Sequence, residues 1–94
     1  MIIDIKHRAL HRSKILQGQM KGIEKMIENE EYCMNIITQS LAIQKSLSSL
    51  NKLIVENHLR THIIEKLSSA EKKKHAEATS ELLDLYELTH VRSK

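Results

Sequence analysis

Two histidines lie four residues apart in the stretch ENHLRTH. His58 and His62 belong to a segment, residues 54–64, that contains neither Gly nor Pro. On an α-helix, side chains four residues apart project from the same face, about one turn apart. Imidazole nitrogens are ligands for Zn, Cu, Ni and Co. The pair therefore supplies half of a candidate transition-metal site, and the remaining ligands must come from elsewhere.

The only cysteine, Cys33, is the candidate third ligand. It precedes His58 by 25 residues, which at about 100° per residue is about 20° short of seven whole turns, so both side chains share one helix face. They are also about 37 Å apart along the helix axis, too far for one chain to bring them to one metal ion. Two copies of this helix packed antiparallel would place Cys33 of one copy beside His58 and His62 of the other. On spacing alone, Cys33 as a small buried hydrophobe and the histidines as a solvated face remain alternatives.

Helices must position these residues, because the chain of 94 residues contains no Pro, only two Gly and many strong helix formers. We predict an all-α chain that forms a single domain over residues 1–94, with helices at about residues 7–28, 30–67 and 70–88. The first helix is marked by an apolar stripe with steps of three and four residues. Its members are Leu16, Met20, Ile23 and Ile27.

The boundaries of the helices follow from capping residues. Asn29 is expected to cap the second helix, because a side-chain oxygen there can accept from the free amides of the first turn. Ser68 and Glu71 form a capping-box pattern before the third helix. Residues 89–94 are expected to be a frayed end.

The helix lengths predict a dimer. The first helix is about 33 Å long and the second about 55 Å, so a hairpin of the two leaves the end that carries His58 and His62 with uncovered apolar surface. An antiparallel partner related by a two-fold axis would cover that surface, and two hairpins would then form a four-helix bundle.

Composition bounds the functional class. A single cysteine allows no intrachain disulfide and fits a reduced, cytoplasmic setting. No segment is long and apolar enough for a signal peptide or a membrane span. No HExxH, paired-carboxylate or nucleophile motif is present, so we expect neither an enzyme nor a small-molecule substrate. The net charge of +3 permits a nucleic-acid partner without requiring one.

Three stretches resemble the CsoR/RcnR family of bacterial metal-sensing repressors: LQGQMKGIEKMIENEEYC, ITQSLAIQKSL and ENHLRTH. The resemblance covers about residues 8–88. It implies a repressor that binds operator DNA when metal-free and releases it when metal-loaded. It also implies that the third helix assembles two dimers into a tetramer, and that Cys33, His58 and His62 are the intersubunit ligands.

The predicted ligand set does not decide which metal ion binds. Copper-sensing members of the family more often carry Cys at the position of His62, whereas nickel- and cobalt-sensing members carry His there and recruit a further N-terminal His. That further position corresponds to Met1 here, and His7 and His11 lie in a different register. A Cys-His-His set suits Cu(I), so copper is favoured, nickel or cobalt is the alternative, and Zn(II) could also bind. Aldehyde-sensing and persulfide-sensing relatives share the scaffold of this family, but His62 and the lone Cys33 argue against either of those functions here.

A metal site and a DNA-binding surface also need supporting residues. Tyr32 and Glu81 are candidates for an outer-shell hydrogen bond to a ligating histidine. Arg12 and Lys52 match basic positions of the family, whereas Ile15 and Gln44 replace residues that are commonly basic. The candidate DNA contacts, which carry no helix-turn-helix or zinc-finger signature, are Arg8, Arg12, Lys14, Lys21, Lys45 and Lys52.

Two readings remain open from sequence. His7 and His11 form a second pair four residues apart, either a solvated or DNA-facing helix start or auxiliary metal ligands. The competing function is a helical scaffold or metal carrier without a role on DNA.

Overall fold

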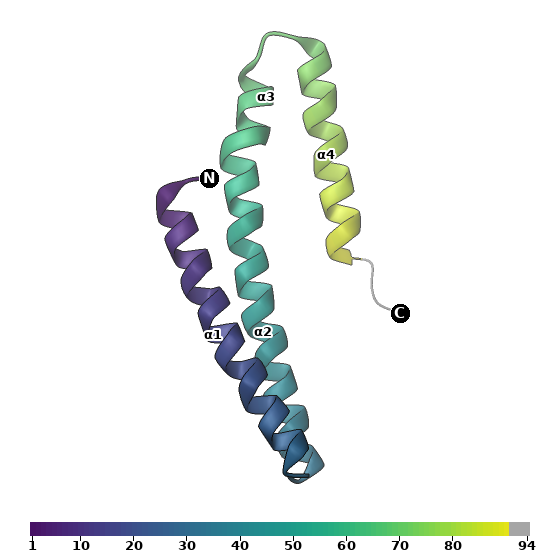
Figure 1. Ribbon diagram of the computed structural model, residues 1–94. Coiled ribbons are helices and arrows are strands. Elements are labelled where there is room, and N and C mark those ends of the chain that lie inside the picture. Colours follow the sequence, from purple (N-terminus) through teal and green to yellow (C-terminus); the bar gives the residue numbers. More distant parts are fainter. Residues whose placement is uncertain (91–94) are drawn as a thin grey trace. The chain divides into compact units, whose positions relative to one another are not determined.

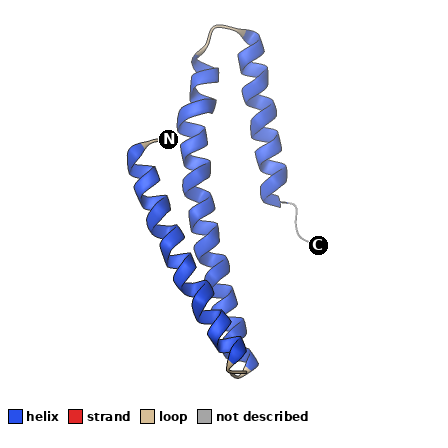
Figure 2. Cartoon of the chain, viewed as in Figure 1, coloured by secondary structure: helices blue, strands red, loops and turns tan. Residues whose placement is uncertain are grey.

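The computed structural model describes residues 1–90, and all of the secondary structure in that range is helical (Figures 1 and 2). The elements are α1 (Ile3–Glu28), α2 (Cys33–His58), the π-helix η1 (Leu59–Ile63), α3 (Ile64–Ser68) and α4 (Lys72–His90). The prediction of an all-α chain with three helices is confirmed, since α2, η1 and α3 follow one another without a break. Residues 91–94 of the predicted frayed end lie outside the described range.

The first helix begins four residues before the predicted start because a distant side chain completes its first turn. The Ile2 carbonyl accepts from the Lys6 amide at 2.8 Å. The Ile2 amide, which has no acceptor within the helix, donates to Oδ1 of Asn57 at 2.9 Å. Asp4 also adds a negative charge to the first turn, where the helix dipole favours it.

The turn between α1 and α2 corrects the predicted role of Asn29. Asn29 ends α1 rather than starting α2, and Glu30 adopts a left-handed backbone conformation with φ of 49°. The Glu31 amide then donates to the Met26 carbonyl at 3.0 Å, as in a Schellman-type helix end. The next helix consequently begins at Cys33, where the Tyr32 carbonyl accepts from the amides of Asn35 and Ile36.

Residues 1–57 form one compact unit, in which α1 lies antiparallel to α2 (Figure 1). Its buried apolar residues are Ile5, Ala9 and Leu53, with Ile2 and Leu50 packed against them. The remaining apolar stripe is only partly covered, and Met20 and Ile27 are 53% and 57% exposed. The unit therefore has a small core and a large uncovered apolar surface.

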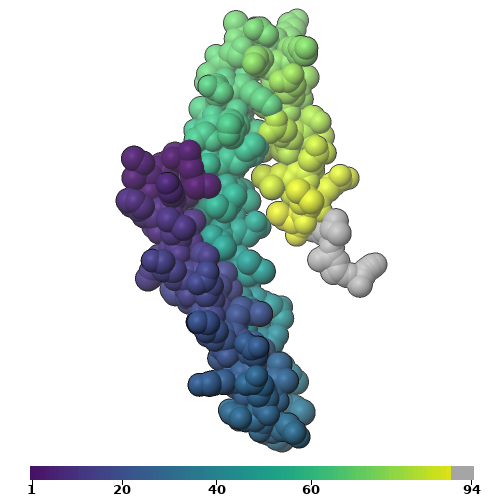
Figure 3. Space-filling view, in the orientation of Figure 1, coloured from purple at the N-terminus to yellow at the C-terminus, as the bar shows by residue number. Residues whose placement is uncertain are grey.

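The described residues from His58 to His90 form a second compact unit. Ile63 and Ala78 are its buried apolar residues, and the side chains of α3 and of the first turns of α4 form one continuous surface (Figure 3). The predicted capping box of Ser68 and Glu71 is wrong. α4 begins at Lys72, and the Glu71 carbonyl accepts from the amides of Lys74 and His75. Oγ of Ser69 accepts from the Glu71 amide at 3.1 Å, before the helix begins. Four large apolar side chains of α4 are exposed: Leu82, Leu83, Tyr86 and Leu88.

No helix within residues 1–90 is long and apolar enough to cross a membrane.

Candidate metal centre and basic surface

His58 and His62 lie where α2 passes into the π-helix, since His58 ends α2 and His62 belongs to η1. Their ring centroids are 5.2 Å apart and the rings are tilted by 39°. A π-turn inside an α-helix is rare and occurs frequently at functional sites. The two imidazoles predicted to share a face lie close together, and the π-turn falls within the same stretch of helix.

Glu81 of α4 orients His58. Nε2 of His58 lies 2.8 Å from Oε1 of Glu81, with the two side chains 40% and 33% exposed. An ionised carboxylate can only accept, so Nε2 carries the proton of this hydrogen bond. In the neutral ring Nδ1 then keeps its lone pair, which leaves that atom able to bind a metal ion.

Lys66 is a member of this cluster that sequence reasoning missed. Its ammonium donates to Oε2 of Glu81 and lies 3.8 Å from Oε1 of Glu77. The hydrogen bonds from Lys66 and, secondarily, from His58 hold the pKa of Glu81 below its usual range, and the hydrogen bond to Glu81 raises the pKa of Lys66. The sequence holds one sign that Lys66 lies near the two histidines, since it follows His62 by four residues, as His62 follows His58.

Cys33 and Tyr32 lie at the other end of α2 from His58. Cys33 is the first residue of that helix and is exposed, and Tyr32 directly before it is 72% exposed. Within residues 1–90 of one chain, no group of three or more His, Cys, Asp or Glu side chains is arranged to hold a metal ion. Within the described part of one chain, Cys33 therefore does not join His58 and His62 in a common group of ligands.

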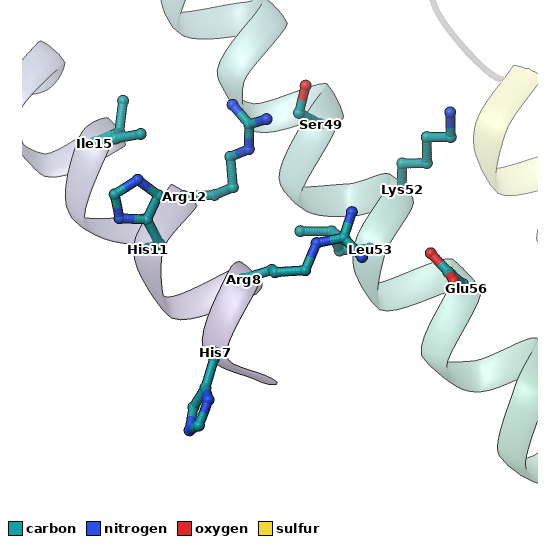
Figure 4. A pocket seen from close by; sticks show the side chains of 9 residues that line it. All are labelled: His7, Arg8, His11, Arg12, Ile15, Ser49, Lys52, Leu53 and Glu56. Atoms are coloured by element: carbon teal, nitrogen blue, oxygen red, sulfur yellow. The ribbon is translucent and has the colours of Figure 1, made fainter. Parts of the chain in front are cut away.

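A concave basic surface lies between α1 and α2 in the first unit, with a volume of about 660 Å³ (Figure 4). Arg8 and Arg12 extend from α1 toward α2, which contributes Lys52. The other residues that line it are His7, His11, Ile15, Ser49, Leu53 and Glu56.

The structure thus gathers three of the six predicted DNA contacts, Arg8, Arg12 and Lys52, on one surface. Lys14 is exposed on α1 but does not line this hollow. The remaining two predicted residues line separate hollows. Lys21 lies beside the acidic residues Glu24 and Glu28, and Lys45 lies beside Gln44.

Comparison with known proteins places these features in context. A family model described as "Metal-sensitive transcriptional repressor" matches residues 5–87. The copper-sensing transcriptional repressor CsoR of Bacillus subtilis is 31% identical over 81 residues, which are 86% of this chain and 77% of that protein. The transcriptional repressor RcnR of Salmonella paratyphi B is 25% identical over 81 residues, which are 86% of this chain and 90% of that protein.

The CsoR of Mycobacterium ulcerans is 38% identical over 60 residues, which are 64% of this chain and 51% of that protein. The aligned region thus spans about half the length of this mycobacterial relative.

Proposed function

Because this chain belongs to the CsoR/RcnR family of metal-sensitive transcriptional repressors, which is not a family of enzymes, we propose that it represses transcription in the cytoplasm by binding operator DNA when metal-free and releasing it when it binds Cu(I). The observation that carries the proposal is the pair of imidazoles at the π-turn. His58 is oriented there by Glu81 so that Nδ1 can accept a metal ion.

Cys33 of a second copy is the proposed third ligand. One described chain offers no complete ligand group, and Cys33 and His58 bound a helix of 26 residues, whose ends are about 38 Å apart. Antiparallel pairing of two copies would bring the start of one α2 beside the end of the other. A metal ion bound there would join two chains, and a thiolate with two imidazoles is a donor set for Cu(I).

Uncovered apolar side chains support the proposed assembly. On α2, Ile37, Leu41 and Leu47 are 50%, 58% and 55% exposed, which is surface that a second hairpin would bury in a four-helix bundle. On α4, Leu83 and Leu88 are 63% and 76% exposed. We propose that the α2 surface contributes to the dimer and the α4 surface to a tetramer of two dimers.

The donor set and the relatives together favour copper. A soft thiolate selects Cu(I) over harder ions, and the relatives named copper-sensing are 31% to 39% identical, against 25% for RcnR. His62 in the last ligand position keeps Ni(II) or Co(II) as the alternative, and Zn(II) could occupy the same atoms.

Release of DNA follows from linkage between two sites. If metal and DNA favour different arrangements of the assembled chains, each weakens the binding of the other by the same factor, typically corresponding to about 1–3 kcal/mol. The proposed contacts are Arg8, Arg12 and Lys52 on the concave basic surface, where they would meet phosphate groups. The outer-shell role of Tyr32 and the DNA contacts of Lys14, Lys21 and Lys45 stay predictions.

The direct test is a titration of the reduced protein with Cu(I), Ni(II), Co(II) and Zn(II), followed by fluorescence anisotropy on a labelled duplex from the promoter of its own gene. We expect Cu(I) to lower DNA affinity by about tenfold or more, within the usual range of such couplings. A Cu(I) complex with unchanged DNA affinity would refute the copper assignment. A metal-free protein that never binds this duplex would favour the scaffold or metal-carrier alternative.

A further inference from the structure

His7 and His11 lie on the concave basic surface but have no part in the proposed metal centre. Both line the hollow together with Arg8, Arg12 and Lys52 (Figure 4). In the close-up, the arginines extend toward α2, the His11 imidazole lies beside Arg12, and the His7 imidazole projects from α1 away from α2. Both histidines are exposed and line the same hollow as the arginines, so a DNA duplex laid over this surface is large enough to meet both groups.

Resting on the DNA-binding function proposed above, we propose that His7 and His11 are phosphate-contacting residues of this surface and that their protonation tightens operator binding. Imidazole is the side chain that changes charge between about pH 5 and pH 8. A protonated imidazole has two N–H donors and a positive charge, which suit a backbone phosphate oxygen. Each histidine that is protonated adds one positive charge to this surface.

The charges around the two histidines favour an anion. Arg8 and Arg12 on α1 and Lys52 on α2 supply three permanent positive charges, and Glu56 is the acidic residue that lines the hollow. Asp4 on α1 lies 3.7 Å from Arg8, but this pair is exposed, with side chains 57% and 79% accessible. Lys14, one turn after His11, adds a further positive charge on α1. A phosphate group would thus meet more cations than anions here.

The size of the effect follows from counterion release. Each phosphate contact adds about 0.9 to the slope of log affinity against log salt, which corresponds to about an eightfold gain in affinity at about 0.1 M salt relative to 1 M. One imidazole that becomes charged and contacts a phosphate should therefore raise DNA affinity by about eightfold between pH 8 and pH 6, with a steeper salt dependence.

The test measures binding of metal-free protein, kept so by a chelator, to the labelled promoter duplex at pH 8, 7 and 6 and at several salt concentrations. The wild-type protein should bind more tightly at pH 6 than at pH 8, by about eightfold for each histidine that contacts a phosphate, and the double variant His7→Gln/His11→Gln should lose most of this gain. His75→Gln is the matched control, because His75 lies on α4 and donates to the Ser69 carbonyl, a hydrogen bond that Gln can also make. Far-UV circular dichroism verifies that the variants remain helical.

The outcomes separate the two proposals. A double variant that keeps the full pH dependence, or a wild-type protein whose binding does not change with pH, would overturn the role of the histidines while leaving the repressor function intact. Absence of DNA binding at every pH would overturn the repressor function and this inference with it.

Discussion

Two variants that each lack part of the proposed ligand set should restore metal binding when they are mixed. Cys33→Ser removes the thiolate, and the double variant His58→Ala/His62→Ala removes both imidazoles. Because α2 holds Cys33 and His58 at opposite ends, about 38 Å apart, a complete site needs two chains. A dimer of one chain of each kind keeps one intact site, formed by Cys33 of the histidine variant and the histidines of the cysteine variant.

The expected recovery can be calculated from two-fold symmetry. After equal amounts exchange subunits at random, about half of the dimers contain one chain of each kind and carry one site instead of two, so capacity should return to about one quarter of wild type. The assay is competition for Cu(I) with a chromophoric chelator, before and after subunit exchange through mild denaturant. Each variant alone should show no tight site.

Recovery near zero after verified exchange would refute the intersubunit site. Tight binding by either variant alone would refute the ligand assignment itself. Mixing the Cys33→Ser protein with Cys33→Ser/His58→Ala/His62→Ala protein is the matched control, because no pairing of these chains contains a thiolate.

Further predictions concern the outer contacts, the basic surface and the core. Glu81→Gln should weaken metal binding by about tenfold, the lower end of the 10–100-fold range for such contacts because His58 and Glu81 are partly exposed, and an unchanged metal Kd would exclude the orienting role. The lowered pKa of Glu81 means that its ion pairs stabilise the second unit above pH 4.5 and that this stabilisation is lost as pH falls through the lower folded-state pKa. Urea unfolding of metal-free protein at pH 7 and pH 3 should show that loss in wild type and less of it in Glu81→Gln. Arg12→Ala and Lys52→Ala should each reduce the salt slope of operator binding by about one without changing metal affinity, whereas an unchanged slope would remove that residue from the DNA surface. Leu53→Ala should lower the free energy of unfolding by about 2–3 kcal/mol, because Leu53 is 6% exposed in a small cluster.

Sequence reasoning located the helices to within a few residues where local signals decide them. α1 ends at Glu28, as the loss of its apolar stripe predicts. The predictions from sequence were wrong at the connection between α1 and α2. There Glu30 takes a left-handed conformation, and Asn29 ends a helix instead of starting one. A helix end depends on which backbone amides find partners, and several residues nearby could have supplied them.

For the candidate site too, some features could be predicted from the sequence and others depend on packing. The spacing of four residues placed His58 and His62 together, and the structure agrees. Glu81 was named beside Tyr32 as a candidate outer-shell partner because a ligating histidine commonly bonds a carboxylate or a tyrosine, but the 2.8 Å contact between Glu81 and His58 comes from packing of α4. Lys66 was missed because its four-residue spacing from His62 places it on the helix face but does not show that a carboxylate from another helix will meet it.

The sequence by itself determined the helical class, the shared face of Cys33 and His58, and the residue types that suit a metal and DNA, because these follow from side-chain chemistry and a period of 3.6 residues. Only the tertiary structure decided three other features. These are the start of α1 on Asn57, the π-turn at residues 59–63, and the union of His58, Glu81 and Lys66. The Ile2–Asn57 contact and the contacts of Glu81 with His58 and Lys66 join residues that lie 15 to 55 positions apart in the chain. Their geometry therefore depends on how helices pack and not on any local pattern.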